Sequence, residues 1–396
     1  MSVTGRYEFN IPDYVKIVME RLFSAGESVY IVGGSVRDTL LNKDAHDFDL
    51  TSSALPERVI ELFSDMRVIP TGLSHGTVTV VSDGHPLEIT TFRVDGEYRD
   101  MRHPEEVIYT KRIEEDLSRR DFTVNAMAYN QREGLVDVFF GISDLNNKII
   151  RTVRDPYERF NEDALRIMRA FRFSAQLGFT IEESTLKAAA ELSEKLTLIS
   201  KERILSEFIK LICSPYPQEP LKLMRNLGVM KYIFDGYQPS DIAIDSLALS
   251  EPDELLRLAL FFSDASADLA RLELSRLKAS NKQKSASSIV DVQKNAISSR
   301  KELAKLRASI GDLAFIALKS SVLLGFSPES SLAFLNDKTP SSISELAIGG
   351  NDLISLGYEG REIGKLLSRL LDAVIDDPSL NTREKLIDIC RSRVAF

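Results

Sequence analysis

The stretch GGSVRDTLLNKDAHDFDLTSSA, residues 33–54, combines a glycine turn with two closely spaced aspartates and decides how the first part of the chain folds. The apolar run SVYIV precedes it, and the spacing of apolar residues after Gly34 is helical, which predicts a strand, a tight turn and a helix. Asp47 and Asp49 are separated by one residue. Because residues i and i+2 of a strand point to one face, both carboxylates are expected on the same side.

The paired carboxylates predict a cation site, and the glycines predict an anion site beside it. Two nearby carboxylates repel each other unless a cation lies between them, and hard oxygen ligands suit Mg²⁺, which also takes phosphate oxygens. Backbone N–H groups of a glycine turn at a helix start bind phosphate, and Arg37 lies one turn into that helix. Alone, the aspartates would indicate a solvated edge strand and the glycines an ordinary turn. Together they indicate a two-metal phosphoryl-transfer site.

Outward from this stretch, the character of the chain changes near Arg151. Before it, two β-branched runs flank Asp83-Gly84, which predicts a hairpin. After it, the apolar spacing is helical almost throughout. Pro156 predicts the start of a helix and Gly178 the end of one. The expected fold is therefore α+β, with a mixed-sheet domain followed by helices.

Composition narrows the class of protein. The chain has 396 residues, 43% apolar content and a net charge of -9, so any nucleic-acid contact must be a local patch on an acidic body. Cys213 and Cys390 are the two cysteines, far apart in sequence, which argues against a disulfide framework or a zinc site. No secretory signal or long apolar stretch is recognisable, so a soluble cytoplasmic protein is expected.

A second stretch, NEDALRIMRAFRF at residues 161–173, places an acid before arginines at every third position. Taking Asp163 to Arg172 as one helix, each step of three residues moves about 60° backward around the axis. Asp163 and Arg166 are then neighbours, while Arg169 and Arg172 wind away from them. The polar stripe is left to face a cleft, and the other side is apolar.

These motifs resemble the class II tRNA nucleotidyltransferases, the CCA-adding enzymes, which share a head domain with bacterial poly(A) polymerases and belong to the DNA polymerase beta superfamily. GGSVRD with DFDLTSSA matches the head. LSRRDFTVNAMAYN, residues 117–130, is similar to the second motif of the family, and DVFFGISDLNNKIIR, residues 137–151, to the hinge between head and neck. NEDALRIMRAFRF is similar to the nucleotide-selecting motif. The resemblance covers nearly the whole chain, although residues 241–336 add little.

The resemblance implies a polymerase beta-like head and assigns its site. Asp47 and Asp49 would be the catalytic residues that hold the metal ions, Mg²⁺, and Glu88 is a candidate third carboxylate. Gly34 and Arg37 would line the triphosphate pocket. The implied domains are a head over residues 1–150, a helical neck over 151–212 that carries the nucleotide-selecting helix, a helical body over 213–300 and a helical, tRNA-binding tail over 301–396.

On the neck, Asp163 and Arg166 would select the base. An aspartate accepts a hydrogen bond from an exocyclic amine, and an arginine donates to ring nitrogens or carbonyls, so the pair admits cytosine and adenine but meets uracil and guanine with mismatched groups. Arg169 and Arg172 are assigned to the same nucleotide site by the resemblance. The alternative is a surface helix held by i, i+3 ion pairs.

Other charged residues have simpler alternatives. By the resemblance, Arg120 would bind the phosphate or ribose of ATP or CTP, but an ion pair with Asp121 would also explain it. Lys201 and Arg203, in KERILSEFIKLI, are candidate RNA phosphate contacts, although such residues are more often solvated charges.

The expected function is the template-independent addition of C, C and A to the 3′ end of tRNA from CTP and ATP, with release of pyrophosphate. tRNA, CTP and ATP are the expected partners, and homodimerisation is left open. Poly(A) polymerase and an enzyme that adds only A are the rivals, although poly(A) polymerases tend to carry a basic extension that this sequence lacks. Residues 93–107 resemble the loop of complete CCA-adding enzymes that lets the pocket switch from C to A. The non-enzyme alternative is an inactive RNA-binding protein.

Overall fold

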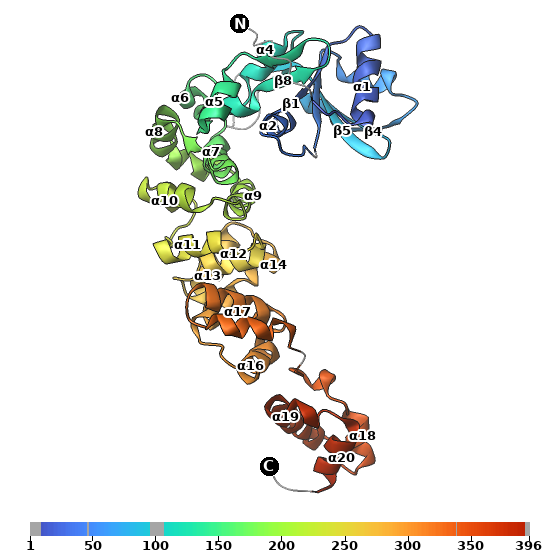
Figure 1. The fold of residues 1–396 in the computed structure, drawn as a ribbon, viewed down its shortest axis with the longest axis vertical. Coiled ribbons are helices and arrows are strands. Elements are labelled where there is room, and N and C mark those ends of the chain that lie inside the picture. Colours follow the sequence, from blue (N-terminus) through green and yellow to red (C-terminus); the bar gives the residue numbers. More distant parts are fainter. Residues whose placement is uncertain (1–8, 46, 96–106, 338, 393–396) are drawn as a thin grey trace. The chain divides into compact units, whose positions relative to one another are not determined.

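The computed structural model describes residues 9–45, 47–95, 107–337 and 339–392. The chain forms two compact units, one of Met1–Leu211 with Asn226–Ile233 and one of Ile212–Arg225 with Phe234–Phe396. The first unit holds a mixed sheet and helices, and the second is helical (Figure 1). The α+β prediction is therefore confirmed. No helix in the described part of the chain is long and apolar enough to cross a membrane.

A seven-stranded sheet organises the first unit, in the order β3-β4-β5-β2-β1-β8-β9. Only the β2–β5 pair is parallel, so the sheet is mixed. The strands are β1 Val29–Val32, β2 Asp49–Ser52, β3 Arg67–Gly72, β4 Thr77–Ser82, β5 His85–Thr91, β8 Met127–Asn130 and β9 Gly134–Asp137. Two further two-stranded sheets pair β6 Arg93–Asp95 with β7 Val107–Tyr109 and β10 Ile149–Ile150 with β11 Thr180–Ile181.

The predicted hairpin is confirmed between β4 and β5. Ser82 pairs with His85, which leaves a two-residue loop at Asp83 and Gly84. Both loop residues have positive φ, 52° and 80°, as the tight turns that suit twisted strands require. The turn fixes the register of β5, so that Ile89 lies beside Leu50 of β2.

The predicted strand, turn and helix are also confirmed. β1 ends at Val32, Gly33 has φ 74° and ψ -131°, and α2 spans Gly34–Leu40. A side chain at Gly33 would be strained at this φ and would approach Arg120 Nη1 to 3.3 Å. The glycine therefore allows the backbone and a guanidinium to lie against each other.

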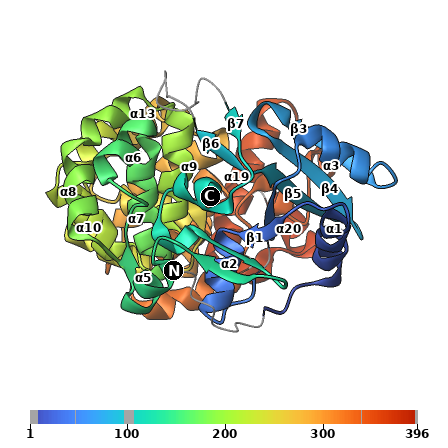
Figure 2. The same ribbon diagram turned by 90° about the horizontal axis from the view of Figure 1, so that it is seen from above.

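Short helices pack around the sheet (Figures 1 and 2). α1 Asp13–Ser24 packs on β1 and β4, α2 on β1 and β8, and α3 Pro56–Leu62 on β4. α4 Ile113–Ser118 contacts β8, and its Leu117 joins Tyr30 and Phe92 in a buried apolar cluster. This cluster packs α4 against β1 and β8, and β2, which pairs with β1, carries one of the two aspartates.

Helices follow the head. They are α5 Gly141–Asn147, α6 Pro156–Glu162, α7 Leu165–Leu177, α8 Glu183–Glu191, α9 Lys201–Ile212 and α10 Gln218–Asn226. Both predicted boundaries are confirmed: the Asp155 side chain accepts from the Glu158 N–H at 3.0 Å ahead of Pro156, and Gly178 ends α7 with φ 70°. The prediction of one helix from Asp163 to Arg172 is wrong, because the chain leaves α6 at Asp163 and α7 begins at Leu165.

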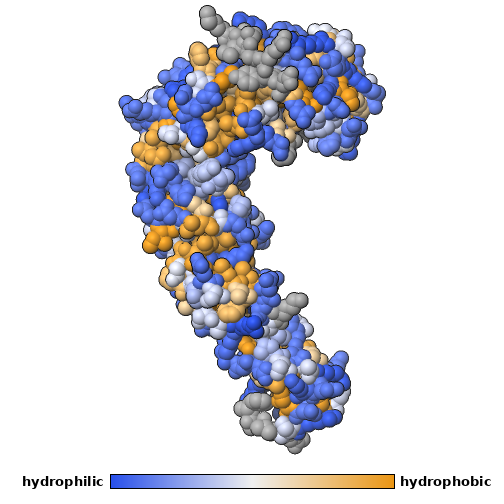
Figure 3. All heavy atoms as spheres, in the orientation of Figure 1, coloured by the Kyte–Doolittle hydropathy of each residue, from blue (hydrophilic) through white to orange (hydrophobic). Residues whose placement is uncertain are grey.

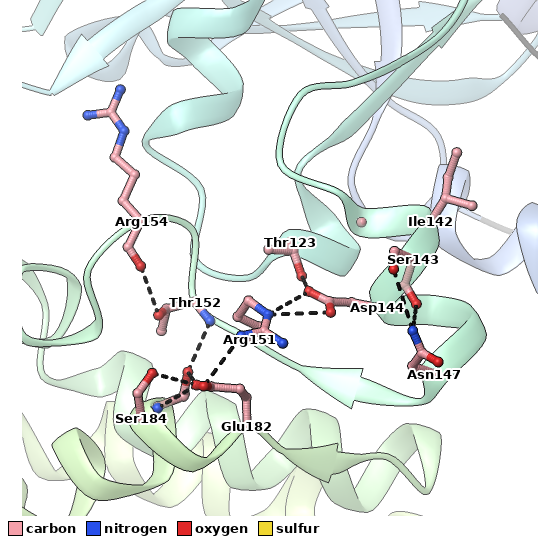
Figure 4. Close-up of polar contacts among 12 residues, drawn as sticks. Thr123, Ile142, Ser143, Asp144, Asn147, Arg151, Thr152, Arg154, Glu182 and Ser184 are labelled. Carbon is pink, nitrogen blue, oxygen red and sulfur yellow. Dashed lines mark hydrogen bonds and ion pairs between the residues drawn. The ribbon is translucent and has the colours of Figure 1, made fainter. Parts of the chain in front are cut away.

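Arg151 joins the end of the head to α8 (Figure 4). Its Nε donates to Asp144 Oδ2 of α5 at 3.1 Å, and its Nη1 lies 3.3 Å from Glu182 Oε1 at the start of α8. Burial raises the pKa of Glu182, but hydrogen bonds from Ser184 and from the Thr185 N–H and hydroxyl outweigh it and lower that pKa to about 2. The hinge is therefore a charged network fixed at both ends.

The second unit consists of helices. They are α11 Asp241–Leu249, α12 Glu254–Phe261, α13 Ala267–Arg276, α14 Asn281–Lys284, α15 Ser287–Val290, α16 Arg300–Ile310, α17 Leu313–Leu323, α18 Gly350–Ser355, α19 Arg361–Asp376 and α20 Arg383–Arg391. One apolar cluster joins α16 and α17, and another joins α18, α19 and α20. Hydrophobic side chains gather over α11–α13 on the face drawn in Figure 3. In α11, Ile242 and Leu249 are exposed.

Candidate active site

A cavity of about 480 Å³ lies in the first unit, between the glycine turn, the segment after α4 and the helix α7. It gathers most of the side chains predicted from the sequence, namely Gly34, Arg37, Asp49, Arg120, Asp163, Arg166, Arg169 and Arg172. The remaining predicted residue, Asp47, lines a second cavity of about 430 Å³, which also includes Asp49. The predicted residues therefore converge, although they come from segments far apart in the chain.

The phosphate cradle predicted from the sequence consists of Gly34 and Arg37, both of which lie in α2 and line the cavity. Arg37 is 4% exposed, and its guanidinium donates to Asn125 Oδ1 at 2.7 Å and to both oxygens of Asp38. A Cβ at Gly34 would lie 3.5 Å from Arg37 Nη2, so the glycine leaves the guanidinium close to the backbone. The guanidinium is thus fixed in place before any anion arrives.

The two aspartates lie at the start of β2, a central strand of the sheet, and both line the second cavity, as the predicted shared face requires. Asp47 and Asp49 are exposed and Phe48 between them is buried, an alternation that continues into β2. Burial raises the pKa of Asp49, and the negative charges of Glu88 and, to a smaller extent, Asp47 raise it further. The positive charge of Arg120 lowers it in part. A cation at this position would relieve that repulsion, so these oxygens fit a hard divalent ion.

Glu88, the candidate third carboxylate, lines the second cavity with Asp47 and Asp49. Even so, within residues 9–45, 47–95, 107–337 and 339–392 no three His, Cys, Asp or Glu side chains come close enough to hold one metal together. Any ion on the paired aspartates would need oxygens from a nucleotide or from water to complete its shell.

Arg120 is held beside the aspartates by an acid that sequence reasoning missed. Asp116 is fully buried and binds Arg119 at 2.8 Å and Arg120 at 3.4 Å. Burial raises the pKa of Asp116, but the charges of Arg119 and Arg120 hold it below the usual range. The alternative ion pair of Arg120 with Asp121 is wrong. The Nε of Arg120 is buried and has no hydrogen-bond partner among the described residues, whereas the Arg120 side chain as a whole lines the cavity.

Asp163 has a different role in the fold from the one predicted. Its Oδ1 accepts from the Leu165 N–H at 3.0 Å and so caps α7, and its Oδ2 accepts from Arg203 at 2.8 Å. Aspartate favours such caps over helix interiors because its short side chain reaches backbone N–H groups. Asp163 still lines the cavity, held in place by its hydrogen bonds with the Leu165 N–H and with Arg203. Arg203 also lines the cavity, and sequence reasoning left it out of the site.

Arg166 is fixed by a separate set of partners. Its guanidinium binds Glu162 and donates to the carbonyl oxygens of Arg159 and Arg119, both at 3.1 Å. Asp163 and Arg166 therefore both line the cavity, but each has its own supporting contacts. The alternative of a solvated surface helix is wrong, because Arg166 and Arg172 are 8% and 9% exposed.

The last two arginines of α7 are paired with distant acids. Arg169 Nε donates to Asp121 Oδ2 at 2.7 Å, and Arg172 Nε donates to Glu207 Oε2 at 2.5 Å. Burial raises the pKa of Asp121, but Arg169 outweighs it and holds that pKa below the usual range. Arg203 and Glu207 lie four residues apart on α9, a spacing that puts both on one helix face. That charged face, which contacts Asp163 and Arg172, could have indicated that α9 lies beside the site.

The loop expected to switch the pocket from C to A is only partly described. Its stem is the pair of β6 and β7, with Arg93 opposite Tyr109. Residues 96–106, which include Gly96 and Arg102, lie outside the described residues.

The chain is similar to proteins of known family. The profile of the poly A polymerase head domain matches residues 29–151, and that of the probable RNA and SrmB-binding site of polymerase A matches residues 178–240. A CCA-adding enzyme of Pediococcus pentosaceus is 37% identical over 94% of this chain and 96% of its own. One of Ligilactobacillus salivarius is 36% identical over 96% of both chains. The crystal structure of the Bacillus stearothermophilus CCA-adding enzyme in complex with CTP superposes with a TM-score of 0.78 at 28% identity, covering 96% of this chain and 98% of that one.

Proposed function

The chain belongs to the family of CCA-adding enzymes, and from this premise we propose that it adds C, C and A to the 3′ end of tRNA, using CTP and ATP and releasing pyrophosphate. The observation that carries the proposal is the cavity that unites Asp49, the Arg37 cradle and the Asp163–Arg166 segment. Carboxylates, phosphate-binding guanidinium groups and a base-reading segment are the parts that nucleotidyl transfer needs in one place.

Asp47 and Asp49 would hold Mg²⁺ in a two-metal arrangement. Their fit rests on their oxygens, because Asp49 lines both cavities and Asp47 lines the second. Burial first, and then the charges of Glu88 and Asp47, raise the pKa of Asp49, and a cation would offset that cost. When bound, the metal ions supply positive charge to the attacking RNA 3′-hydroxyl and to the leaving pyrophosphate. The pair of aspartates fixes where that charge lies, next to the phosphate cradle.

The triphosphate would lie against the arginines of the cavity. Arg37 and Arg120 flank the glycine turn and line the cavity. Arg169 and Arg172 of α7 add guanidinium groups to the same cavity. Guanidinium forks bind phosphate oxygens bidentately, so these side chains orient the nucleotide and neutralise part of its charge.

Asp163 and Arg166 would select the base without a nucleic-acid template. Each Asp163 oxygen uses one lone pair on a protein donor and keeps another for an exocyclic amine. Arg166 would donate to the ring nitrogen or carbonyl beside that amine. Uracil and guanine turn a carbonyl toward the aspartate and an N–H toward the arginine, and each unpaired buried group costs about 1–3 kcal/mol.

The division of the chain into a head (1–150), neck (151–212), body (213–300) and tail (301–396) is part of the proposal. The helices beyond the site would bind the tRNA acceptor stem through backbone and shape. Location in the cytoplasm and Mg²⁺ as the working ion belong to the same proposal.

One experiment tests the function against its rivals. The protein is incubated with tRNA that lacks its 3′ end, Mg²⁺, and each NTP alone or mixed, and the products are sequenced. We expect CCA and nothing longer. A long A tail would indicate a poly(A) polymerase, addition of A only to tRNA that already ends in CC would indicate the partial enzyme, and no incorporation would indicate an RNA-binding protein without activity.

A further inference from the structure

The second cavity, of about 430 Å³, meets the nucleotide cavity at Asp49, which lines both. It continues along Asp47 and Glu88 to an aromatic pair, Tyr14 and His85. Tyr14 lies in the first turn of α1 and His85 is the first residue of β5 after the Asp83–Gly84 turn.

Tyr14 and His85 stack face to face. Their ring centroids are 4.3 Å apart and their planes are inclined by 16°. Tyr14 is half-buried and His85 is exposed, and both line the cavity, so the pair is accessible there. Aromatic faces of this kind are the surfaces on which single-stranded bases stack.

The two cavities differ in charge. The nucleotide cavity is lined by Arg37, Arg120 and the arginines of α7, which suits a triphosphate. Around the second cavity, the described lining residues include Asp47, Asp49 and Glu88 and no lysine or arginine. Carboxylates repel phosphate but accept hydrogen bonds from ribose hydroxyls, so this cavity suits the uncharged part of a nucleotide, its sugar and base.

The reaction requires such a site. In nucleotidyl transfer the attacking oxygen and the leaving pyrophosphate lie roughly in line across the phosphorus atom. With the triphosphate in the arginine-lined cavity, the RNA 3′-hydroxyl must reach Asp49 from elsewhere, and the second cavity opens at that residue.

Resting on the function proposed above, we propose that the second cavity binds the terminal nucleoside of the acceptor RNA strand. Its base stacks on the Tyr14–His85 pair, and its ribose lies near Asp49 and Glu88. The pair is thus an acceptor-end binding site, separate from the groups that select the incoming base.

Single-turnover addition of CMP to tRNA lacking its 3′ end tests the site in the variants Tyr14→Ala, His85→Ala and His85→Phe. Loss of one stacked base should lower kcat/KM for tRNA by roughly 5- to 150-fold, and we expect about tenfold. The KM for CTP should stay unchanged, because the nucleotide lies in the other cavity. His85→Phe keeps a stacking face and should restore most of the activity.

His75→Ala is the matched control, since His75 lies on the same domain outside both cavities. tRNA ending in 5-iodocytidine, irradiated with the wild-type protein, should crosslink to Tyr14 or His85. If His85→Ala and Tyr14→Ala keep kcat/KM within twofold of an active wild type, or the crosslink falls elsewhere, the acceptor site is refuted while the proposed function stands. If the wild type adds no nucleotide at all, it is the proposed function that fails.

Discussion

Replacing Phe173 by leucine should weaken nucleotide binding, because the Phe173 ring lies against three guanidinium groups of the site. The Cζ atoms of Arg172, Arg169 and Arg37 are 3.8, 5.2 and 5.6 Å from its centroid. The ring is 5% exposed and lines the nucleotide cavity. It therefore holds arginines from α2 and α7 in one array.

The size of the effect follows from these contacts. A cation over an aromatic face within about 6 Å contributes about 0.5–1 kcal/mol when exposed and about 2 kcal/mol when desolvated. Arg172 is the closest of the three and should dominate. A loss of about 1.4 kcal/mol is tenfold in binding, so we expect the KM for CTP and the KM for ATP to rise about tenfold. The rise should be the same for both nucleotides, because in the proposed function these arginines contact the triphosphate, which CTP and ATP share.

Leucine is chosen because it keeps most of the buried volume. Volume-conserving changes cost less than about 1.5 kcal/mol of stability, whereas alanine at a buried phenylalanine costs about 3–5 kcal/mol and would confuse unfolding with binding. KM and kcat for both nucleotides would be measured together with the thermal midpoint of unfolding. A change confined to KM would indicate loss of uniform nucleotide binding.

Phe122→Leu is the matched control. Phe122 is fully buried and meets Phe173 edge-on at 5.6 Å, yet no cation–π contact to it occurs in the described chain. Its replacement should lower the unfolding midpoint about as much as Phe173→Leu does and leave both KM values unchanged. The array would be refuted if the two variants had the same KM, or if Phe173→Leu affected ATP and CTP unequally.

Three further predictions concern the metal pair, base choice and the hinge. Asp47→Ala and Asp49→Ala should each reduce turnover by more than about 100-fold, because metal charge contributes at least that much to such reactions. Binding of tRNA, measured in a filter assay, should be retained. Turnover within tenfold of wild type would count against the metal role. Asp163→Ala and Arg166→Ala should admit UMP and GMP into the product, whereas unchanged fidelity in sequenced tails would contradict the template role. The pKa of Glu182 is lowered to about 2 in the folded protein, so its charge stabilises the fold above the unfolded value near 4.5, and this stability is lost as pH falls toward 2. Over that interval the unfolding midpoint of wild type should fall toward that of Glu182→Gln. A difference between the two midpoints that stays constant with pH would contradict the prediction.

Short-range signals predicted the parts of the fold that local conformation decides. The loop at Asp83 and Gly84 needs two residues with positive φ, which this dipeptide supplies, and the hairpin formed as expected. Gly33 likewise supplies the positive φ between β1 and α2. These features depend on residues next to each other in the chain, so the sequence was sufficient.

The break between α6 and α7 shows where periodicity fails. Apolar residues continue at helical spacing from Phe160 through Phe171, so one helix explained the pattern. The structure instead ends α6 at Glu162 and uses the Asp163 side chain to cap α7. Both arrangements keep the same apolar side toward the core, and only the capping preference of aspartate distinguishes them.

The partners of Arg169 and Arg172 could not be predicted from their own segment, although Glu162, the partner of Arg166, lies within it. Asp121 precedes Arg169 by 48 residues, and Glu207 follows Arg172 by 35. Such contacts depend on how the sheet domain, α7 and α9 pack, and ion-pair spacing within one helix carries no information about them.

The same partners explain how an acidic chain sustains a basic cavity. Buried arginines on one helix repel one another unless each has a counter-charge. Each arginine that α7 directs toward the cavity has an acid of its own, and the pairs are Arg166–Glu162, Arg169–Asp121 and Arg172–Glu207. A guanidinium has five N–H donors, and Asp121 engages Arg169 through Nε and Nη2, so other donors of Arg169 are left for the nucleotide of the proposed function. The acids hold the arginines in position, so removing one acid should displace its arginine and weaken nucleotide binding although the net positive charge of the cavity rises.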